Sequence, residues 1–319
     1  PCHSYTFHKI YQLHQKANSI RLLEYRFKNQ FVIYPIIIFD VPKEISSENY
    51  KFATSAYGFT GHLIRGTKSF IDDAFHYINN WLVKEKIVAE FVRFSPFLNY
   101  EINLLQRYDY QISNNRIMAM WDSSISKNKN DNSQYSCNMS KRAKKAGVIF
   151  SEIKEDKLNL FQELYIKTML INKADKFFFY SKNYFDKLYE FNNLYNNFVY
   201  GVFSKNKLVA AAWFIELNGL AVYHLGCNNR NIPGLSNLVL REAIKDLVIN
   251  KDVKEINLTG GRTTDLKDKL LRFKSSIANS SKDFYVGKRS IMPKNYKKLI
   301  IKYNKLYAEK LSNKFIPWS

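Results

Sequence analysis

The sequence predicts a mixed α/β protein of two domains, each a mostly antiparallel sheet flanked by helices. The chain has 319 residues, of which 46% are hydrophobic, and this is enough to bury one large core or two small ones. Apolar residues also switch repeatedly between helical and strand spacing. A segment rich in Ser, Asn, Asp and Lys at 122–138 separates two such series. We therefore expect an N-terminal domain at 1–138 and a C-terminal domain at 139–319.

The N-terminal domain should be a small unit of strands and helices that ends near Trp121. Phe7, Ile10 and Tyr11 fall at helical spacing, which predicts an opening helix. The longest apolar run, 31–39, is about half the length of a membrane-spanning helix and is predicted to be a strand. The expected elements are a helix at 4–17, strands at 21–27 and 31–39 around an Asn29-Gln30 turn, a helix at 70–84 and a strand at 87–94.

The C-terminal domain should contain an antiparallel meander that continues into a parallel strand. Asn218-Gly219 suits a two-residue hairpin turn, and a helix between the last two strands requires those strands to be parallel. The expected elements are helices at 156–171 and 181–194, strands at 198–203, 208–217 and 220–227, a helix at 234–250 and a strand at 253–258.

Composition limits the possible functions. The net charge is +21, which suits either phosphate-bearing partners or the Lys- and Asn-rich usage of an AT-rich genome. Cys2, Cys137 and Cys227 are too widely spaced for a metal site and are expected to be reduced thiols. The chain shows no secretory signal pattern and no apolar run of membrane-spanning length, so we expect a cytoplasmic protein without a transmembrane segment.

The loop at 228–234 is a candidate anion site. It leads from the last meander strand into a helix, and a helix start offers free N–H groups and positive dipole to a phosphate. Gly234 would permit close approach, and Arg230, Ser236 and Asn237 could donate hydrogen bonds. An ordinary capped helix after a Pro-Gly turn is the alternative.

Several short motifs occur in the order found in one enzyme family. The strand at 253–258 ends in Thr259-Gly260-Gly261, which is followed by Asp265-Leu266 and by the sequence Leu-Arg-Phe-Lys at 271–274. Earlier in the chain stand Ala-Tyr-Gly-Phe-Thr-Gly at 56–61, Phe-Val-Arg-Phe-Ser-Pro-Phe at 91–97 and Lys-Arg-Ala-Lys-Lys-Ala-Gly at 141–147. Together they resemble FemAB-type transferases, which are peptidoglycan-bridge aminoacyltransferases and related acyltransferases built from two domains of the GNAT acyltransferase fold.

This resemblance implies transfer of an acyl group from an activated donor, without a tightly bound cofactor. The donor would be acyl-CoA or aminoacyl-tRNA. The sequence Arg230-x-x-x-Gly234 departs from the usual acetyl-CoA-binding pattern of GNAT enzymes, which leaves the donor open. The acceptor would be a sugar or nucleotide-linked sugar for the cell surface, and DNA is not expected as a partner.

The resemblance also implies roles for individual residues. Lys274 of the Phe-Lys motif would lie near the carbonyl under attack, with Phe273, Gly260 and Gly261 close to the substrate. His224, in the third meander strand, is either a proton acceptor for catalysis or a packed core residue.

The N-terminal domain offers an aromatic and cationic wall for the acceptor. Tyr57, Phe59 and His62 lie on a Gly-punctuated loop, and Arg93 stands at a strand end. Arg93 would otherwise form an ion pair with Glu90 or Asp109. Four basic residues either contact phosphate or tRNA or form a solvated helix face: Lys141, Arg142, Lys144 and Lys145.

We therefore predict a FemAB-like acyl- or aminoacyltransferase that modifies a cell-surface glycan precursor. An acetyl-CoA-dependent N-acetyltransferase of an amino sugar is the alternative enzyme. A noncatalytic RNA-binding protein is the alternative from another class; the charge favours it, but no RNA-binding signature supports it.

Overall fold

The computed structural model describes residues 2–15, 17–99, 102–125, 131–190, 194–307 and 315–317, and its contacts divide the chain into two units. The N-terminal unit holds Cys2–Asn115 and Phe284–Ser319, and the central unit holds Arg116–Asp283. The chain passes between them within β6 (Gln111–Asp122) and again within β12 (Ser280–Ser290). This division differs from the predicted boundary at 138/139, because the polar segment lies inside the central unit.

The sheet of the N-terminal unit runs in the order β1-β2-β3-β5-β12, with β4 paired to β2. β3 and β5 are parallel, and the other pairs in this unit are antiparallel. The predicted hairpin at 21–39 is present and turns at 28–29. The bounds are β1 (Ser19–Phe27), β2 (Gln30–Asp40), β3 (Lys51–Thr54), β4 (Leu63–Arg65) and β5 (Ile87–Arg93).

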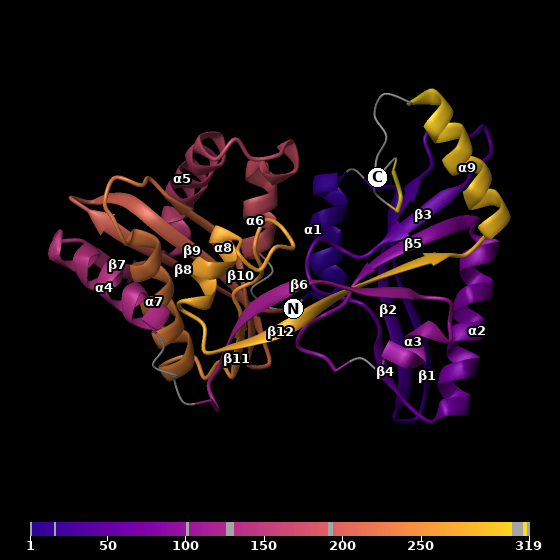
Figure 1. The fold of residues 1–319 in the computed structure, drawn as a ribbon, viewed down its shortest axis with the longest axis horizontal. Helices are drawn as coiled ribbons and strands as arrows, with labels where there is room; N and C mark the ends of the chain where they lie inside the picture. Colours follow the sequence, from indigo (N-terminus) through magenta and orange to yellow (C-terminus); the bar gives the residue numbers. More distant parts are fainter. Residues whose placement is uncertain are drawn as a thin grey trace. The chain divides into compact units, whose positions relative to one another are not determined.

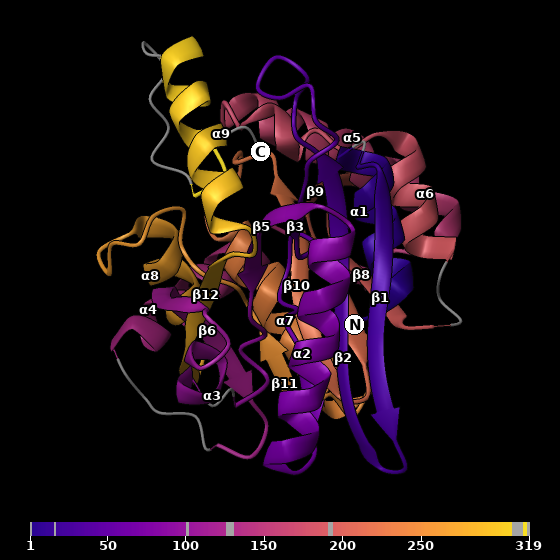
Figure 2. The ribbon, with the colours of Figure 1, turned by 90° about the vertical axis from the view of Figure 1, so that its right-hand side faces the viewer.

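Helices cover both faces of this sheet. α2 packs its apolar stripe onto Val32 and Ile36 of β2, and the Thr67 side chain accepts the Phe70 N–H at its start. α1 lies on the other face (Figures 1 and 2). Both helices confirm the predicted ones. The bounds are α1 (Tyr5–Gln15), α2 (Lys68–Lys84), α3 (Ile102–Gln106) and α9 (Pro293–Leu306).

The central unit contains the predicted meander and the parallel strand beside it. Its strand order is β6-β11-β10-β9-β8-β7, and β10 and β11 are parallel. A β-bulge falls between Tyr223 and Leu225 of β10, where the register against β9 shifts. The bounds are β7 (Ile149–Glu152), β8 (Asn196–Ser204), β9 (Lys207–Leu217), β10 (Leu220–Asn228) and β11 (Glu255–Asn257).

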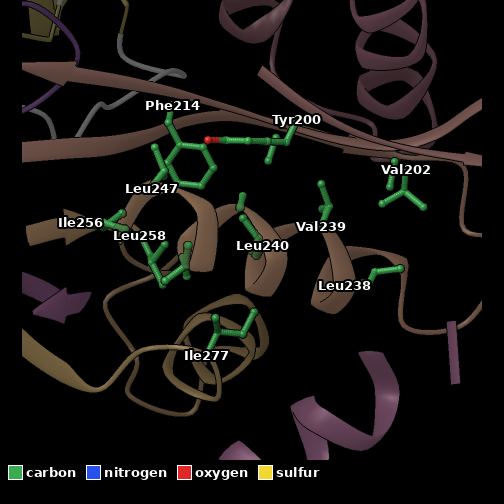
Figure 3. Close-up of a cluster of buried hydrophobic side chains, with 14 of the residues drawn as sticks. Tyr200, Val202, Phe214, Leu238, Val239, Leu240, Leu247, Ile256, Leu258 and Ile277 are labelled. Atoms are coloured by element: carbon green, nitrogen blue, oxygen red, sulfur yellow. The ribbon is translucent and has the colours of Figure 1, made fainter. Parts of the chain in front are cut away.

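Neighbouring residues of β9 define the two faces of this sheet. Trp213 packs on Phe161 of α5 and Phe185 of α6. Phe214 joins the cluster that contains α7, drawn in Figure 3. α5 and α6 therefore cover one face of the sheet, and α4 and α7 cover the other, as Figure 1 shows. The bounds are α4 (Asp131–Lys145), α5 (Leu158–Ile171), α6 (Lys182–Glu190), α7 (Leu235–Ile249) and α8 (Lys269–Ser275).

The predicted linker at 122–138 is wrong over 131–138, which form the first half of α4; residues 126–130 lie outside the described part. Ser133, Ser136, Ser140 and Ala143 recur at helical spacing and are buried. These small side chains let α4 approach α7 closely, but three of them are polar, so they gave no apolar pattern. No helix in the described ranges is long and apolar enough to cross a membrane.

Candidate functional site

A strained loop after β11 holds the predicted Gly-Gly motif. Thr259 has φ of 66°, which is unfavourable for a β-branched residue. A Cβ at Gly260 would stand 2.9 Å from the Ile117 carbonyl oxygen, and one at Gly261 would stand 2.5 Å from Asp268 Oδ1. Glycine is therefore required at both positions by close packing within the central unit.

Lys274 of α8 reaches this loop. Its side chain is 5% exposed, and Nζ donates to Thr259 Oγ1 and, at 3.0 Å, to the Gly260 carbonyl. Nζ also lies 5.7 Å from the centre of the Tyr223 ring. Burial lowers the pKa of Lys274 to about 7; the nearby Asp268 carboxylate opposes this shift and the Arg116 charge adds to it. Both protonation states are therefore populated near neutral pH.

Asp268 and Arg116 hold the loop in place. Asp268 caps α8, because its Oδ1 accepts the N–H groups of Leu270 and Leu271 at 2.8 and 3.0 Å. Its Oδ2 accepts from the loop residue Thr263. Desolvation acts to raise the pKa of Asp268, but these hydrogen bonds lower it to about 2. Arg116 Nη1 donates to the Gly261 carbonyl at 2.8 Å.

Neither Asp268 nor Arg116 was among the site residues predicted from the sequence. Asp268 had a local signal, since Asp directly before an apolar helical stretch is a common N-cap, but the motif drew attention to Asp265 instead. Asp265 forms a turn, in which its carboxylate accepts the Lys267 N–H. Arg116 gave no local signal, because it acts on a loop 145 residues further along the chain.

His224 stands at the β-bulge of β10, and its side chain lies on the face of the sheet that α6 covers. Its Nε2 shares a 2.7 Å hydrogen bond with the Tyr184 hydroxyl of α6, whereas Tyr223 packs on Phe214. The structure therefore does not bring His224 and Lys274 together. Burial lowers the pKa of His224 to about 3, so the ring is neutral and weakly basic at physiological pH.

The loop before α7 requires a correction to two predicted donor contacts. A Cβ at Gly234 would lie 2.0 Å from the Met139 carbonyl oxygen, so this glycine makes room for α4. Asn237 Nδ2 donates to Ser136 Oγ of the same helix at 3.0 Å. Both positions are committed to packing, because the segment predicted as linker is a helix laid against this end of α7.

Unlike Gly234 and Asn237, Ser236 and Arg230 form hydrogen bonds with residues other than those of α4. Ser236 Oγ accepts from Asn228 Nδ2 at 2.8 Å. Arg230 is exposed, has φ of 60°, and donates through Nη2 to Asn172. Of the predicted donor-binding residues, Arg230 thus offers an exposed cation.

The predicted basic interdomain element lies within the central unit instead. It forms the last turns of α4, where Ala143 is buried against α7 and Lys144 Nζ is 2.8 Å from Glu242 Oε1. Lys141, Arg142 and Lys145 are exposed.

Two of the four predicted acceptor residues lie together in the N-terminal unit. The Arg93 guanidinium lies 5.8 Å from the centre of the Tyr57 ring, and its Nη1 donates to Thr54 Oγ1 at 3.2 Å. These residues stand at or just beyond the carboxyl ends of the parallel strands β3 and β5. Phe59 packs edge-on against Phe284 at 5.2 Å.

His62 is a core residue, contrary to its predicted place in a binding wall. It is 1% exposed, and its ring stacks on Tyr34 with centroids 3.9 Å apart. Its Nε2 shares a hydrogen bond with the Tyr110 hydroxyl at 3.2 Å. Burial and the Arg289 charge hold the pKa of His62 well below its usual value. The sequence around His62 shows only a loop with a neighbouring glycine, Gly61, and such a pattern does not indicate whether the histidine side chain points into the core or into solvent.

Glu90 pairs with Arg289 rather than with Arg93. Arg289 Nε donates to Glu90 Oε1 at 2.6 Å, and both residues are buried. The Tyr34 and Tyr110 hydroxyls donate to the same carboxylate.

No protein-family model and no curated protein matches the chain in sequence. Solved structures do resemble it. FemX is 11% identical, with 92% of each chain covered and a TM-score of 0.69. L-PGS from Bacillus licheniformis is 9% identical, with 93% of this chain and 96% of that chain covered and a TM-score of 0.58. The C-terminal domain (DUF2156) of a putative lysylphosphatidylglycerol synthetase from Agrobacterium fabrum is 10% identical, with 87% and 88% covered and a TM-score of 0.57. At these identities the likeness concerns the fold, and the chain has the two-domain fold of FemX, as its motifs predicted.

Proposed function

We propose that this protein is an acyl- or aminoacyltransferase that acts on an amine or hydroxyl of a cell-surface glycan precursor. The observation that carries the proposal is Lys274, a buried lysine with a pKa of about 7 held against a strained Gly-Gly loop. A perturbed, buried cation on a strained backbone is typical of catalytic sites. The fold shared with FemX and with a putative lysylphosphatidylglycerol synthetase agrees with this reading.

In the reaction, the acceptor nitrogen or oxygen attacks the carbonyl carbon of the donor ester or thioester. The carbonyl oxygen gains negative charge, and the bond from the acyl carbon to the donor oxygen or sulfur then breaks. The proton that the acceptor loses passes to the leaving group or to solvent. Lys274 in its ammonium form would donate to the developing oxyanion. Thr259 Oγ1 and the Gly260 carbonyl engage two of the three N–H groups of an ammonium, within the described residues.

The donor and acceptor would use separate parts of the chain. Arg230 would hold a phosphate of acyl-CoA or of aminoacyl-tRNA through a charge-assisted hydrogen bond. Tyr57 and Arg93 would hold a sugar or nucleotide-linked sugar, since an aromatic face beside a guanidinium suits both the ring and its phosphate.

The test is transfer of a radiolabelled acyl group to a nucleotide-linked amino sugar, with acetyl-CoA and charged tRNA supplied in turn. We expect transfer from one donor, and that donor alone should raise the melting temperature of the protein. Lys274→Met should lower kcat and kcat/KM together by about 10²- to 10³-fold, as loss of an oxyanion donor does.

Lys269→Met is the matched control, because Lys269 lies on the same helix but is exposed. Its activity should stay within about twofold of the unaltered protein, the small effect expected of an exposed side chain. Equal, small effects of the two substitutions would exclude Lys274 from catalysis. Melting unchanged by either donor, together with no transfer, would contradict the proposed reaction.

A further inference from the structure

Helix α9 of the N-terminal unit presents a face made of lysines. Its 14 residues include five lysines and no acidic residue. At 3.6 residues per turn, these lysines and Ile301 fall on one side of the helix. The basic side chains are Lys294, Lys297, Lys298, Lys302 and Lys305, and all five are exposed.

The opposite side of α9 is already occupied by its own unit. Leu299 is 4% exposed and packs in a cluster with Phe52 and Val88. Asn295 Nδ2 donates to the Tyr50 hydroxyl, and the Tyr296 hydroxyl donates to the Phe315 carbonyl. These contacts fix the rotation of the helix about its axis, so the exposed lysines lie on the side away from the core.

We propose that the lysine face of α9 binds an anionic membrane surface through lipid phosphates. Five like charges along a helix of about 21 Å, at 1.5 Å per residue, fall within the size of basic cluster that binds anionic headgroups, and a plane of negative headgroups matches them. Ile301 is 48% exposed in the middle of these lysines and adds an apolar contact at the headgroup level.

The composition of the face favours lipid over nucleic acid. A nucleic-acid surface commonly uses arginine forks on phosphates and aromatic rings that stack on bases. The lysine face has neither, since its residues are lysines and one isoleucine. This inference stands on α9 alone and does not depend on the proposed transferase activity.

The experiment is co-sedimentation of the full chain with phosphatidylcholine vesicles, with and without about 30 mol % phosphatidylglycerol. We expect binding only to the anionic vesicles, and we expect it to weaken steeply as salt is raised from about 0.05 to 0.3 M. A variant with Lys294, Lys297, Lys298 and Lys302 all changed to Gln should bind at least about 100-fold more weakly, since each lysine near such a surface contributes about fivefold.

The matched control changes four exposed lysines elsewhere to Gln, namely Lys68, Lys157, Lys205 and Lys207. It removes the same charge and should bind anionic vesicles within about threefold of the unaltered protein, because scattered charges give little local attraction. Native melting curves for both variants establish that each is folded.

Equal losses in the two variants would overturn the proposal, because net charge rather than α9 would then explain binding. Absence of binding by the unaltered protein would overturn it as well. An RNA duplex that binds through α9, while anionic vesicles do not bind, would replace the lipid with nucleic acid.

Discussion

Lys274 Nζ donates to the Gly260 carbonyl oxygen at 3.0 Å, although the lysine is almost completely buried. The hydrogen bond satisfies the amine but does not replace the water that a charged ammonium loses on burial. The site therefore holds a group whose charged form is disfavoured by its surroundings.

Lys274→Met should stabilise the protein at neutral pH while abolishing most activity. The folded-state pKa of about 7 lies below the usual 10.5, so the unfolded state binds the extra proton between these values. The free energy of unfolding of the unaltered protein therefore rises with pH from about 7 towards 10.5. The substitution removes this cost of about 1.4 kcal/mol per unit of pKa, less the lost hydrogen bonds, and we expect a net gain of about 1 to 3 kcal/mol at pH 7.

Urea denaturation at pH 7 and pH 10 measures this difference. The gain should shrink at pH 10, where the unfolded lysine is also losing its proton. A variant less stable than the unaltered protein at pH 7 would make Lys274 a structural tether of the loop.

The rate of transfer should fall as pH rises through about 7. The ammonium form of Lys274 donates to the oxyanion, and this form is lost above its pKa. A hydroxyl acceptor should be used, because its own protonation does not change in this range. The measurement is kcat/KM between pH 5.5 and 9. We expect kcat/KM of the unaltered protein to fall over this range, and we expect no such fall in Lys274→Met. A rate that rises through pH 7 would instead identify the neutral amine as a base.

Arg230→Ala should weaken donor binding without affecting the fold. Arg230 is exposed and extends from a loop, and its charge-assisted bond to a donor phosphate is expected to contribute about 1 to 3 kcal/mol. Calorimetric titration with the productive donor measures the loss, which corresponds to about a 5- to 150-fold rise in Kd. Lys157→Ala, at an exposed position on another element, should bind the donor normally. Unchanged affinity in Arg230→Ala would exclude this loop from the donor site.

Glu90→Gln should strongly destabilise the N-terminal unit. The neutral amide leaves the buried Arg289 guanidinium uncompensated, which costs about 3 to 5 kcal/mol. The same substitution at Glu24, whose pair with Arg26 is exposed, should cost less than about 1 kcal/mol. Thermal unfolding of the two variants compares them directly, and similar melting temperatures would contradict a critical buried pair.

Periodicity predicted the elements that bury an apolar stripe, and it could not predict helices that pack through small polar residues. The helix at 70–84 is α2 with its start moved by two residues. The segment with Ser133 and Ser136 was expected to be a linker, because buried serines and exposed serines look alike in a sequence. The same omission explains Gly234 and Asn237, which were assigned to a ligand but contact α4.

The site was predictable where its residues are adjacent in the chain. Gly260, Gly261 and Lys274 lie within 15 residues of one another, and the resemblance of their motifs to FemAB-type transferases placed them together. Arg116 was not predictable, because strand pairing decides which distant side chain reaches the loop. Whether a histidine belongs to a binding surface or to the core depends on its burial, which the sequence does not give, as the buried His62 shows.

The path of the chain between its two units sets an order for biosynthesis. Residues 2–115 leave the ribosome long before residues 284–319, yet β5 pairs with β12 and Glu90 finds its counter-charge in Arg289. Residues 2–115 therefore wait through the synthesis of the whole central unit with an unpaired edge on β5 and without the counter-charge of Glu90. Translation must pass β12 before this unit closes, and a nascent chain arrested before residue 284 would be a substrate for chaperones rather than a folded domain.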